Sequence, residues 1–343
     1  MKKRWMFTVC AAAALSMVSC GVEQGSNGKG AATTAQNVTT APVTTEAPTQ
    51  SIRSEAEKIA EEVEHCKAEK DAAEQKMNTC NAEYTEAQKV YDTAKAALDE
   101  YNTEHEDIVP YIGKGTLGFF EYVGADDAVD VLKNAKYASS TKIGEPGDAT
   151  TLENMLATFP HMHTCNIVRD NEDKAALRVT DRLMAIAESN LNWTDEHLES
   201  SGQFDVDENY AAGYENPYYV WYDQEMESEG EHYKRVLNSS YALTGFAFCT
   251  AKRSGQYDFS HCQVFTGKTD EESFTVDEYE ERFMAFYQAE QVAAEDVNRL
   301  TKEVETSKAK AEECKKKLDE AQKQYQEAKT AYQDAEAIYN WYT

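Results

Sequence analysis

The sequence predicts an α+β protein in which a globular head is inserted between two long helices that form an antiparallel coiled-coil stalk. Three observations predict this fold class. Apolar residues recur every seven positions over residues 52–104 and again over residues 277–343. Gly, Pro and aromatic residues concentrate between these two stretches, and alternating apolar runs within the insert indicate strands.

The first long helix, expected over residues 52–104, has two seam positions per heptad. One seam position holds Ile52, Ile59, Cys66, Ala73, Cys80, Ala87, Ala94 and Tyr101, and the other holds Ala56, Val63, Met77, Tyr84, Tyr91 and Leu98. Lys70 is the one charged seam residue. A heptad pattern of this length without Gly or Pro is typical of a coiled coil.

The second long helix, expected over residues 277–343, repeats the pattern. Its seam holds Val297, Val304, Ala311, Leu318, Tyr325, Tyr332 and Tyr339, interleaved with Leu300, Ser307, Cys314, Ala321, Ala328, Ala335 and Tyr342. If Ile52 faces Tyr339, small seam residues mostly oppose large ones, as with Ala73 and Leu318, which favours antiparallel pairing within one chain. Parallel pairing of two chains is the alternative, so self-association through the stalk remains open.

The N-terminal residues 1–19 have the features of a secretory signal: basic residues, a short apolar run and then small residues. The apolar run is too short to span a bilayer. Because Met17-Val18-Ser19-Cys20 resembles the bacterial lipobox, we expect cleavage before Cys20 and lipidation of its thiol. Cys20 would then anchor the protein to the extracellular face of the bacterial cell membrane. The alternative is an ordinary signal peptide that is cleaved nearby.

Residues 20–51 are rich in Gly, Ala, Thr, Gln and Pro and show no hydrophobic period, so they are expected to form a flexible linker. The chain as a whole carries 34 Lys and Arg against 62 Asp and Glu, a net charge of -28. Such a charge repels nucleic acid and anionic lipid headgroups, which excludes both as expected partners. With 41% hydrophobic residues, the chain can bury one moderate core.

Cysteine usage suggests disulfides. Of eight cysteines, one lies in the signal and Cys20 is expected to carry lipid, which leaves six, an even number in an exported chain. Cys249 and Cys262 lie on two strand-like runs and are candidates for a bridge across a hairpin. Cys80 and Cys314 lie one layer apart in the proposed register, and a bridge between them would need a local shift.

Within the insert, residues 105–147 are expected to connect the first helix to a domain at residues 148–267. Three helices are expected there: one capped by Asp148 or Thr150, one that starts near Thr180, and one opened by Pro217. The middle helix should bury Leu183, Met184, Ile186 and Ala187. The runs "TGFAF" and "HCQVFTG" then alternate as strands, so helices and an antiparallel pair should form α-β-α layers.

Several short motifs of this domain occur in a characteristic order: "NIVR" before "LRVTDRLMAIA", then "ENYAAGY", "WYDQE", "HY" and "TGFAF…HCQVF". The ordered set resembles the CAP superfamily, the SCP/PR-1-like domains, across residues 148 to 267. The resemblance implies a CAP-type α-β-α sandwich with a central cleft lined by His197, Glu208, Glu225 and His232. The sequence departs from the family pattern where Asp207 and Glu231 replace glycines.

The four cleft residues also point to metal chemistry. Two imidazoles can ligate a divalent cation, and a carboxylate hydrogen-bonded to each ring would fix its tautomer. We therefore expect zinc or another divalent cation to bind weakly at His197 and His232, because a catalytic zinc usually has three protein ligands. Alternatively, Glu208 and Glu225 hydrogen-bond backbone amides and only hold loops in place.

Three classes of function remain open, and in the last of them the stalk is the functional part, which pairs with other coiled coils while the head is a spacer. In the first, the protein is a cell-surface lipoprotein that presents a CAP domain on its stalk to bind a small-molecule, lipid or protein ligand. In the second, it is an extracellular metal-dependent hydrolase in which His197 and His232 hold the ion and Glu208 or Glu225 activates water. The sequence contains no nucleophile elbow, phosphate-binding Gly loop or HExxH motif. It does not decide whether the protein is an enzyme.

Overall fold

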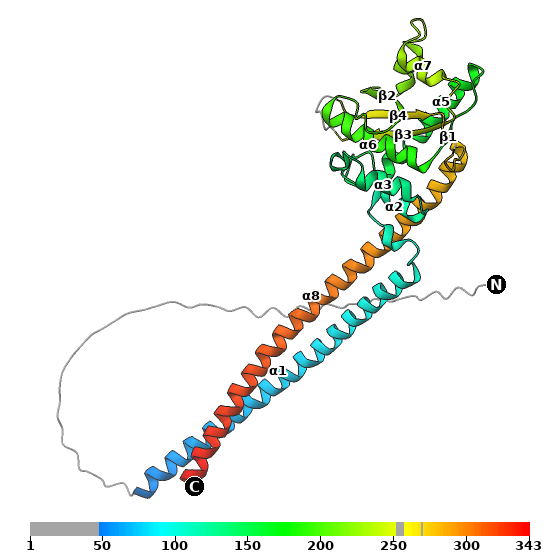
Figure 1. The fold of residues 1–343 in the computed structure, drawn as a ribbon. Helices are drawn as coiled ribbons and strands as arrows, with labels where there is room; N and C mark the ends of the chain where they lie inside the picture. The colour runs from blue at the N-terminus through cyan, green and yellow to red at the C-terminus, as the bar shows by residue number, and fades with distance from the viewer. Residues whose placement is uncertain (1–47, 252–256, 269) are drawn as a thin grey trace, which may run out of the picture. The chain divides into compact units, whose positions relative to one another are not determined.

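A computed structural model describes residues 48–251, 257–268 and 270–343. The described chain has a mixed α+β fold with one small sheet and two long helices, α1 (Pro48–Glu104) and α8 (Val276–Tyr342) (Figure 1). The chain divides into two compact units, Met1–Lys58 and Ile59–Thr343, and the contacts described below lie in the second. The predicted signal, Cys20 and most of the predicted linker lie outside the described residues.

The shielded residues of α1 follow the predicted heptads. From Ile59 to Tyr101 every predicted seam position is buried or half-buried, whereas most intervening positions are exposed. The charged seam residue Lys70 is among the half-buried ones, and its ammonium lies 5.4 Å from the centre of the Tyr332 ring. A long Lys side chain can cover a seam in this way because its methylenes pack while its ammonium stays near water.

The shielded face of α8 likewise follows the predicted seam. Its buried seam residues are Leu300, Ser307, Ala311, Cys314, Leu318, Ala321 and Ala335. Contacts between the two helices are antiparallel, because Lys76 Nζ donates to Gln324 Oε1 at 2.9 Å and Lys315 Nζ lies 5.9 Å from the ring centre of Tyr84. We call α1 from Ile59 and α8 from Val297 the helix pair.

The register of the helix pair differs from the predicted one. In the predicted register Lys76 would lie opposite Lys315, whereas its hydrogen bond reaches Gln324, and the other contacts are displaced in the same direction. The displacement amounts to about one heptad. A shift of seven residues places seam residues opposite seam residues again, so the hydrophobic pattern alone cannot detect it.

The sheet has four strands in the order β1-β3-β4-β2. Strand β3 (Leu243–Cys249) pairs antiparallel with β4 (Ser260–Thr266), which confirms the two predicted strands. Strand β2 (Asp207–Ala212) extends the sheet beyond β4, and the two-residue β1 (Arg178–Val179) pairs parallel with β3. Neither β1 nor β2 was predicted, because β1 is too short for a periodic signal and β2 begins with three polar residues.

Helix α6 (Asp181–His197) covers one face of the sheet (Figure 1). Its N-cap is Thr180, and the four residues predicted to be buried on it are fully buried, which confirms this prediction. Gly245 of β3 permits the close approach, since a Cβ at that position would lie 2.1 Å from the carbonyl of Leu183.

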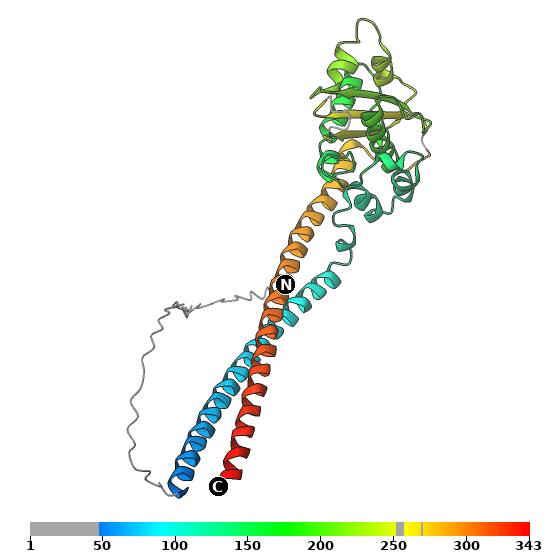
Figure 2. The same cartoon turned by 90° about the vertical axis from the view of Figure 1, so that its left-hand side faces the viewer.

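Other helices cover the opposite face, which Figure 2 shows from a second direction. They are α5 (Phe159–Asn171), a π-helical segment η3 (Tyr219–Asp223) and α7 (Glu231–Leu237). The ring of Phe246 on β3 stacks on that of His161 from α5 and lies 6.0 Å from that of Trp221 from η3. Pro217 precedes a distorted segment rather than the regular helix that the sequence predicts.

Residues 105–147 are part of the head rather than a mere connection. They form η1 (Val109–Tyr111), α2 (Gly115–Tyr122), α3 (Asp126–Asn134) and η2 (Ala138–Ser140), and α3 and η2 pack against α6. Helix α4 (Leu152–Leu156) follows, and its cap is Thr151 rather than Asp148 or Thr150. The side chain of Asp148 instead accepts hydrogen bonds from the backbone amides of Lys142 and Thr150.

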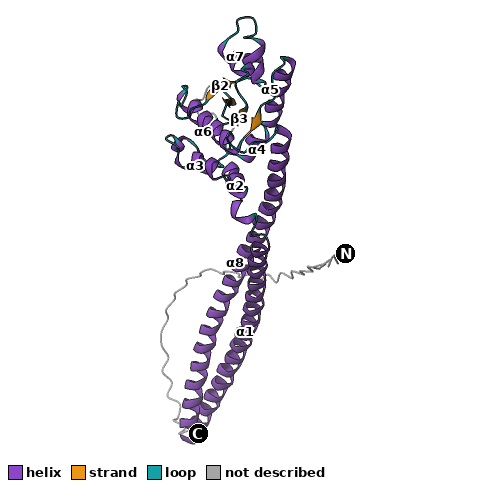
Figure 3. Ribbon diagram, turned by 45° about the vertical axis from the view of Figure 1, so that its right-hand side comes forward, coloured by secondary structure: helices purple, strands orange, loops and turns teal. Residues whose placement is uncertain are grey.

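Helix α8 begins inside the head and continues unbroken into the helix pair (Figure 3). Thr275 caps it in a capping box with Glu278. Phe283 and Phe286 of its first turns are fully buried, and both rings contact the ring of Phe119 on α2. No helix in the described part of the chain is both long enough and apolar enough to cross a bilayer.

The six cysteines of the described residues are thiols in the structure. In the β3–β4 ladder Cys262 lies opposite Ala247 and Cys249 lies opposite Ser260, so the two cysteines are diagonal neighbours. Diagonal Cα atoms are about 7–8 Å apart, beyond the usual span of a disulfide. In the helix pair, Cys314 lines a surface hollow with Ala87 rather than lying beside Cys80. Neither predicted disulfide is present.

Candidate functional site

The segment between Glu208 and Glu225 forms the edge strand β2 and the helical turn η3. Trp221 is fully buried, and its indole N–H donates to the carbonyl of Tyr210 on β2 at 3.0 Å. Tyr218 is also buried, and its hydroxyl donates to Gln263 on β4 at 2.7 Å. These rings attach η3 to the sheet and set the position from which Glu225 projects.

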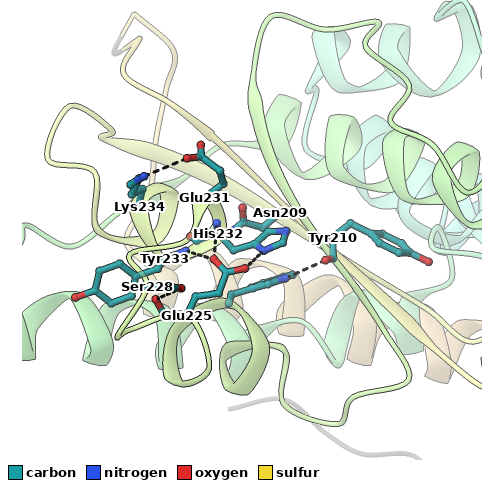
Figure 4. Close-up of polar contacts among 9 residues, drawn as sticks. Asn209, Tyr210, Glu225, Ser228, Glu231, His232, Tyr233 and Lys234 are labelled. Atoms are coloured by element: carbon teal, nitrogen blue, oxygen red, sulfur yellow. Dashed lines mark hydrogen bonds and ion pairs between the residues drawn. The ribbon is translucent and has the colours of Figure 1, made fainter.

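Glu225 and His232 form a close pair at the start of α7 (Figure 4). Glu225 Oε1 lies 2.6 Å from His232 Nδ1, while Glu225 Oε2 accepts hydrogen bonds from the backbone amides of His232 at 2.9 Å and Tyr233 at 3.2 Å. A carboxylate at that distance places the proton of a neutral imidazole on Nδ1 and leaves Nε2 as the acceptor. The side chain of His232 is 37% exposed, so a ligand can reach it.

The electrostatics of the pair favour an ionised Glu225. Partial burial opposes ionisation, but the hydrogen bonds from His232 and from the backbone amides outweigh it and lower the pKa of Glu225 below its ordinary value. Gly230 is required for this arrangement, because a Cβ there would lie 2.2 Å from Glu225 Oε2.

Asn209 supports His232 from the neighbouring strand. Its Nδ2 donates to the carbonyl of His232 at 3.1 Å, and the residue is fully buried. Among the described residues, its Oδ1 has no hydrogen-bond partner. Sequence reasoning missed Asn209 and Gly230 as supports of the site, although each lies within two residues of a predicted site residue.

The other two predicted cleft residues have partners on α6. Glu208 Oε2 accepts a hydrogen bond from Asn190 Nδ2 at 2.9 Å. Glu208 and Asn209 point to opposite faces of the sheet, because side chains alternate along β2. His197 is exposed near the end of α6, where its ring stacks on that of Trp193 at 3.5 Å. The structure therefore joins Glu225 to His232 and gives Glu208 and His197 contacts of their own.

A metal centre has little support in this geometry. Within the described ranges, no group of three or more His, Cys, Asp or Glu side chains is arranged to hold a metal ion. The zinc or other divalent cation expected at His197 and His232 stays a prediction. His161 and Cys165, two residue types that can bind metal, lie one turn apart on α5, where Cys165 is buried and burial lowers the pKa of His161.

Comparison with known proteins gave no match to a family model and no match among curated proteins. The resemblance to the CAP superfamily over residues 148–267 therefore stays a prediction, and the residues and their geometry carry the functional argument.

Proposed function

We propose that the head is a ligand-binding or partner-binding domain of the CAP type, carried on an antiparallel coiled-coil stalk and anchored to the outer face of the bacterial membrane through lipid on Cys20. The observation that carries the binding proposal is the Glu225–His232 pair. It orients an accessible imidazole so that Nε2 can accept a hydrogen bond from a small-molecule, lipid or protein ligand.

The pair supports binding better than metal-dependent hydrolysis. The two oxygens of Glu225 already accept three hydrogen bonds from His232 and Tyr233, which leaves its carboxylate less acceptor capacity for a water molecule. Glu208 accepts from Asn190, and His197 stacks on Trp193. Among the residues that the structure describes, a catalytic zinc would lack its usual set of three protein ligands.

The stalk proposal is supported by the helix pair. The predicted heptad positions from Ile59 to Tyr101 and from Val297 to Tyr339 are shielded, and the contacts of Lys76 with Gln324 and of Lys70 with Tyr332 run antiparallel within one chain. Helices covering both faces of a small, mostly antiparallel sheet support the sandwich that the CAP resemblance implies.

Zinc chloride is a suitable probe of His232, since a neutral imidazole nitrogen binds zinc weakly even when it is alone. We expect zinc to raise the Tm of the full chain by mass action, and the rise to fade below about pH 6 as histidines protonate. His232→Ala should lose the response, and His161→Ala should keep it. Equal responses in the wild type and His232→Ala would contradict the proposal.

Two further experiments distinguish zinc binding by His232 alone from zinc binding by two histidines, and a binding domain from a hydrolase. His197→Ala keeps the zinc response if His232 acts alone and loses it if the two histidines share the ion. Hydrolysis of p-nitrophenyl acetate that depends on both zinc and His232 would support the hydrolase instead of the binding domain.

A further inference from the structure

The last turns of α8 carry an exposed apolar face. Ile338, Trp341 and Tyr342 are 53%, 79% and 42% exposed, and their spacing of three and four residues places them on one side of the helix. We call these three residues the aromatic face. Tyr342 was predicted to lie in the seam, yet it is exposed and its ring contacts that of Trp341 edge-on at 5.2 Å.

The charge pattern changes at the same place. Residues 337–343 contain no charged side chain, whereas charged residues make up 28% of the chain. Residues 302–336 of the same helix contain many exposed charged side chains, among them Lys302, Glu303 and Glu305. The aromatic face is therefore an uncharged surface in a strongly acidic protein.

The antiparallel contacts give this face a definite place along the helix pair. Lys76 contacts Gln324 and Lys70 contacts Tyr332, so α8 approaches its last turn as α1 is followed back toward Ile59. The linker predicted over residues 20–51 leads from α1 back to Cys20. The aromatic face thus lies at the end of the helix pair from which the chain continues to the proposed lipid anchor.

We propose that the aromatic face lies in the headgroup region of a zwitterionic bilayer. Trp and Tyr suit this layer, because their rings bury apolar area while the N–H and O–H groups stay hydrated. The protein's charge of -28 disfavours anionic headgroups, but phosphatidylcholine carries no net charge. The proposal rests on the lipid anchor of the proposed function, which would tether this end of the helix pair to the membrane through the predicted linker.

A second copy of the chain fits the aromatic face less well. Aromatic side chains bury about 150–250 Å² each, so three side chains cannot supply the roughly 800 Å² per partner of a stable protein interface. The face is also narrow, since α8 has charged Glu336 and Asp334 one to two turns before Trp341.

Fluorescence of Trp341 tests the proposal directly. The chain contains Trp5, Trp193, Trp221 and Trp341, and Trp5 lies in the predicted signal. The exported, lipidated protein is incorporated into vesicles of phosphatidylcholine or of its dibrominated form, which quenches only tryptophans in contact with lipid. We expect bromolipid to quench part of the emission, Trp341→Phe to lose that quenched part, and the matched Trp193→Phe to retain it.

The outcomes are distinct. Equal bromolipid quenching of the wild type and Trp341→Phe would overturn the proposal, and so would the absence of quenching in both. A dimer that is seen in sedimentation and that Trp341→Phe dissociates would also overturn it. If the exported protein carries no lipid and stays out of the vesicles, the anchor has failed. The same two vesicle types are then added to that protein in solution. Quenching that depends on Trp341 would support the aromatic face without the anchor, and its absence would reject both.

Discussion

The helix pair and the head place ionisable side chains in opposite environments. In the helix pair, ion pairs such as Arg299 with Asp296 and Glu303 join neighbouring turns at the surface. In the head, Arg169, Glu188 and His261 are at most 1% exposed. Surface pairs contribute little to stability, whereas buried polar groups are costly when a partner is lost. The helix pair should therefore tolerate the loss of a charged, hydrogen-bonded side chain better than the head does.

Arg169 gives the largest expected effect. Its guanidinium donates to the carbonyls of Ala175, Val236 and Asn238, which joins α5 to the turn that follows it and to the end of α7. We expect Arg169→Met to lower the free energy of unfolding by about 3 kcal/mol or more, because buried carbonyls lose their donors. Urea unfolding measures this change in the free energy of unfolding. Arg299→Met in the helix pair should leave the urea midpoint unchanged, and equal losses in the two variants would break the comparison.

His261 should make the head sensitive to acid. Burial, and then the nearby His161, lower the pKa of His261 to about 4, well below the value of an unfolded histidine. The folded state therefore binds fewer protons than the unfolded state between about pH 6.5 and pH 4, and stability falls by about 3 kcal/mol across that window.

Unfolding measured across this pH range tests the role of His261. His261→Gln should flatten the pH dependence, since it removes the titrating ring. His65→Gln on the exposed side of α1 is the matched control and should keep the wild-type slope. A wild-type slope in His261→Gln would show that other groups cause the acid sensitivity.

Glu188 contributes a pH dependence of stability opposite to that of His261. It is buried on α6, where it accepts a hydrogen bond from Thr116, and burial raises its pKa well above the ordinary value. The neutral carboxyl is compatible with folding below about pH 4.5, and stability is lost as pH rises above that value. Glu188→Gln should therefore raise the Tm at pH 7 and leave it nearly unchanged at pH 4. A lower Tm at both pH values would indicate that the carboxyl group has a specific structural role.

The same contrast explains how much of the fold the sequence could predict. Heptads depend on local spacing, so the seam of both long helices and the end of α1 at Glu104 were predicted. The register was wrong by about one heptad because a seven-residue shift preserves the pattern. Strands β3 and β4 alternate apolar residues and were predicted, whereas β2 begins "DEN" and pairs through its backbone with a strand about fifty residues later.

The candidate site was predicted in part. Resemblance selected Glu225 and His232, and the structure places them in contact. It also selected Glu208 and His197, whose observed partners are Asn190 and Trp193 on α6. Such partners depend on which face of β2 a residue occupies and on where α6 ends. Because β2 was not predicted from the sequence, the face that each of its residues occupies could not be predicted either.

The central claim is that Glu225 holds the imidazole of His232 with Nε2 free to meet a ligand. Nitrogen-15 NMR of the histidine rings at about pH 8, where an ordinary imidazole is neutral, reports which nitrogen carries the proton. We expect His232 to be the Nδ1–H tautomer in the wild type, and Glu225→Gln to shift it toward the Nε2–H form that predominates in free histidine. A wild-type His232 that already carries its proton on Nε2 would contradict the account.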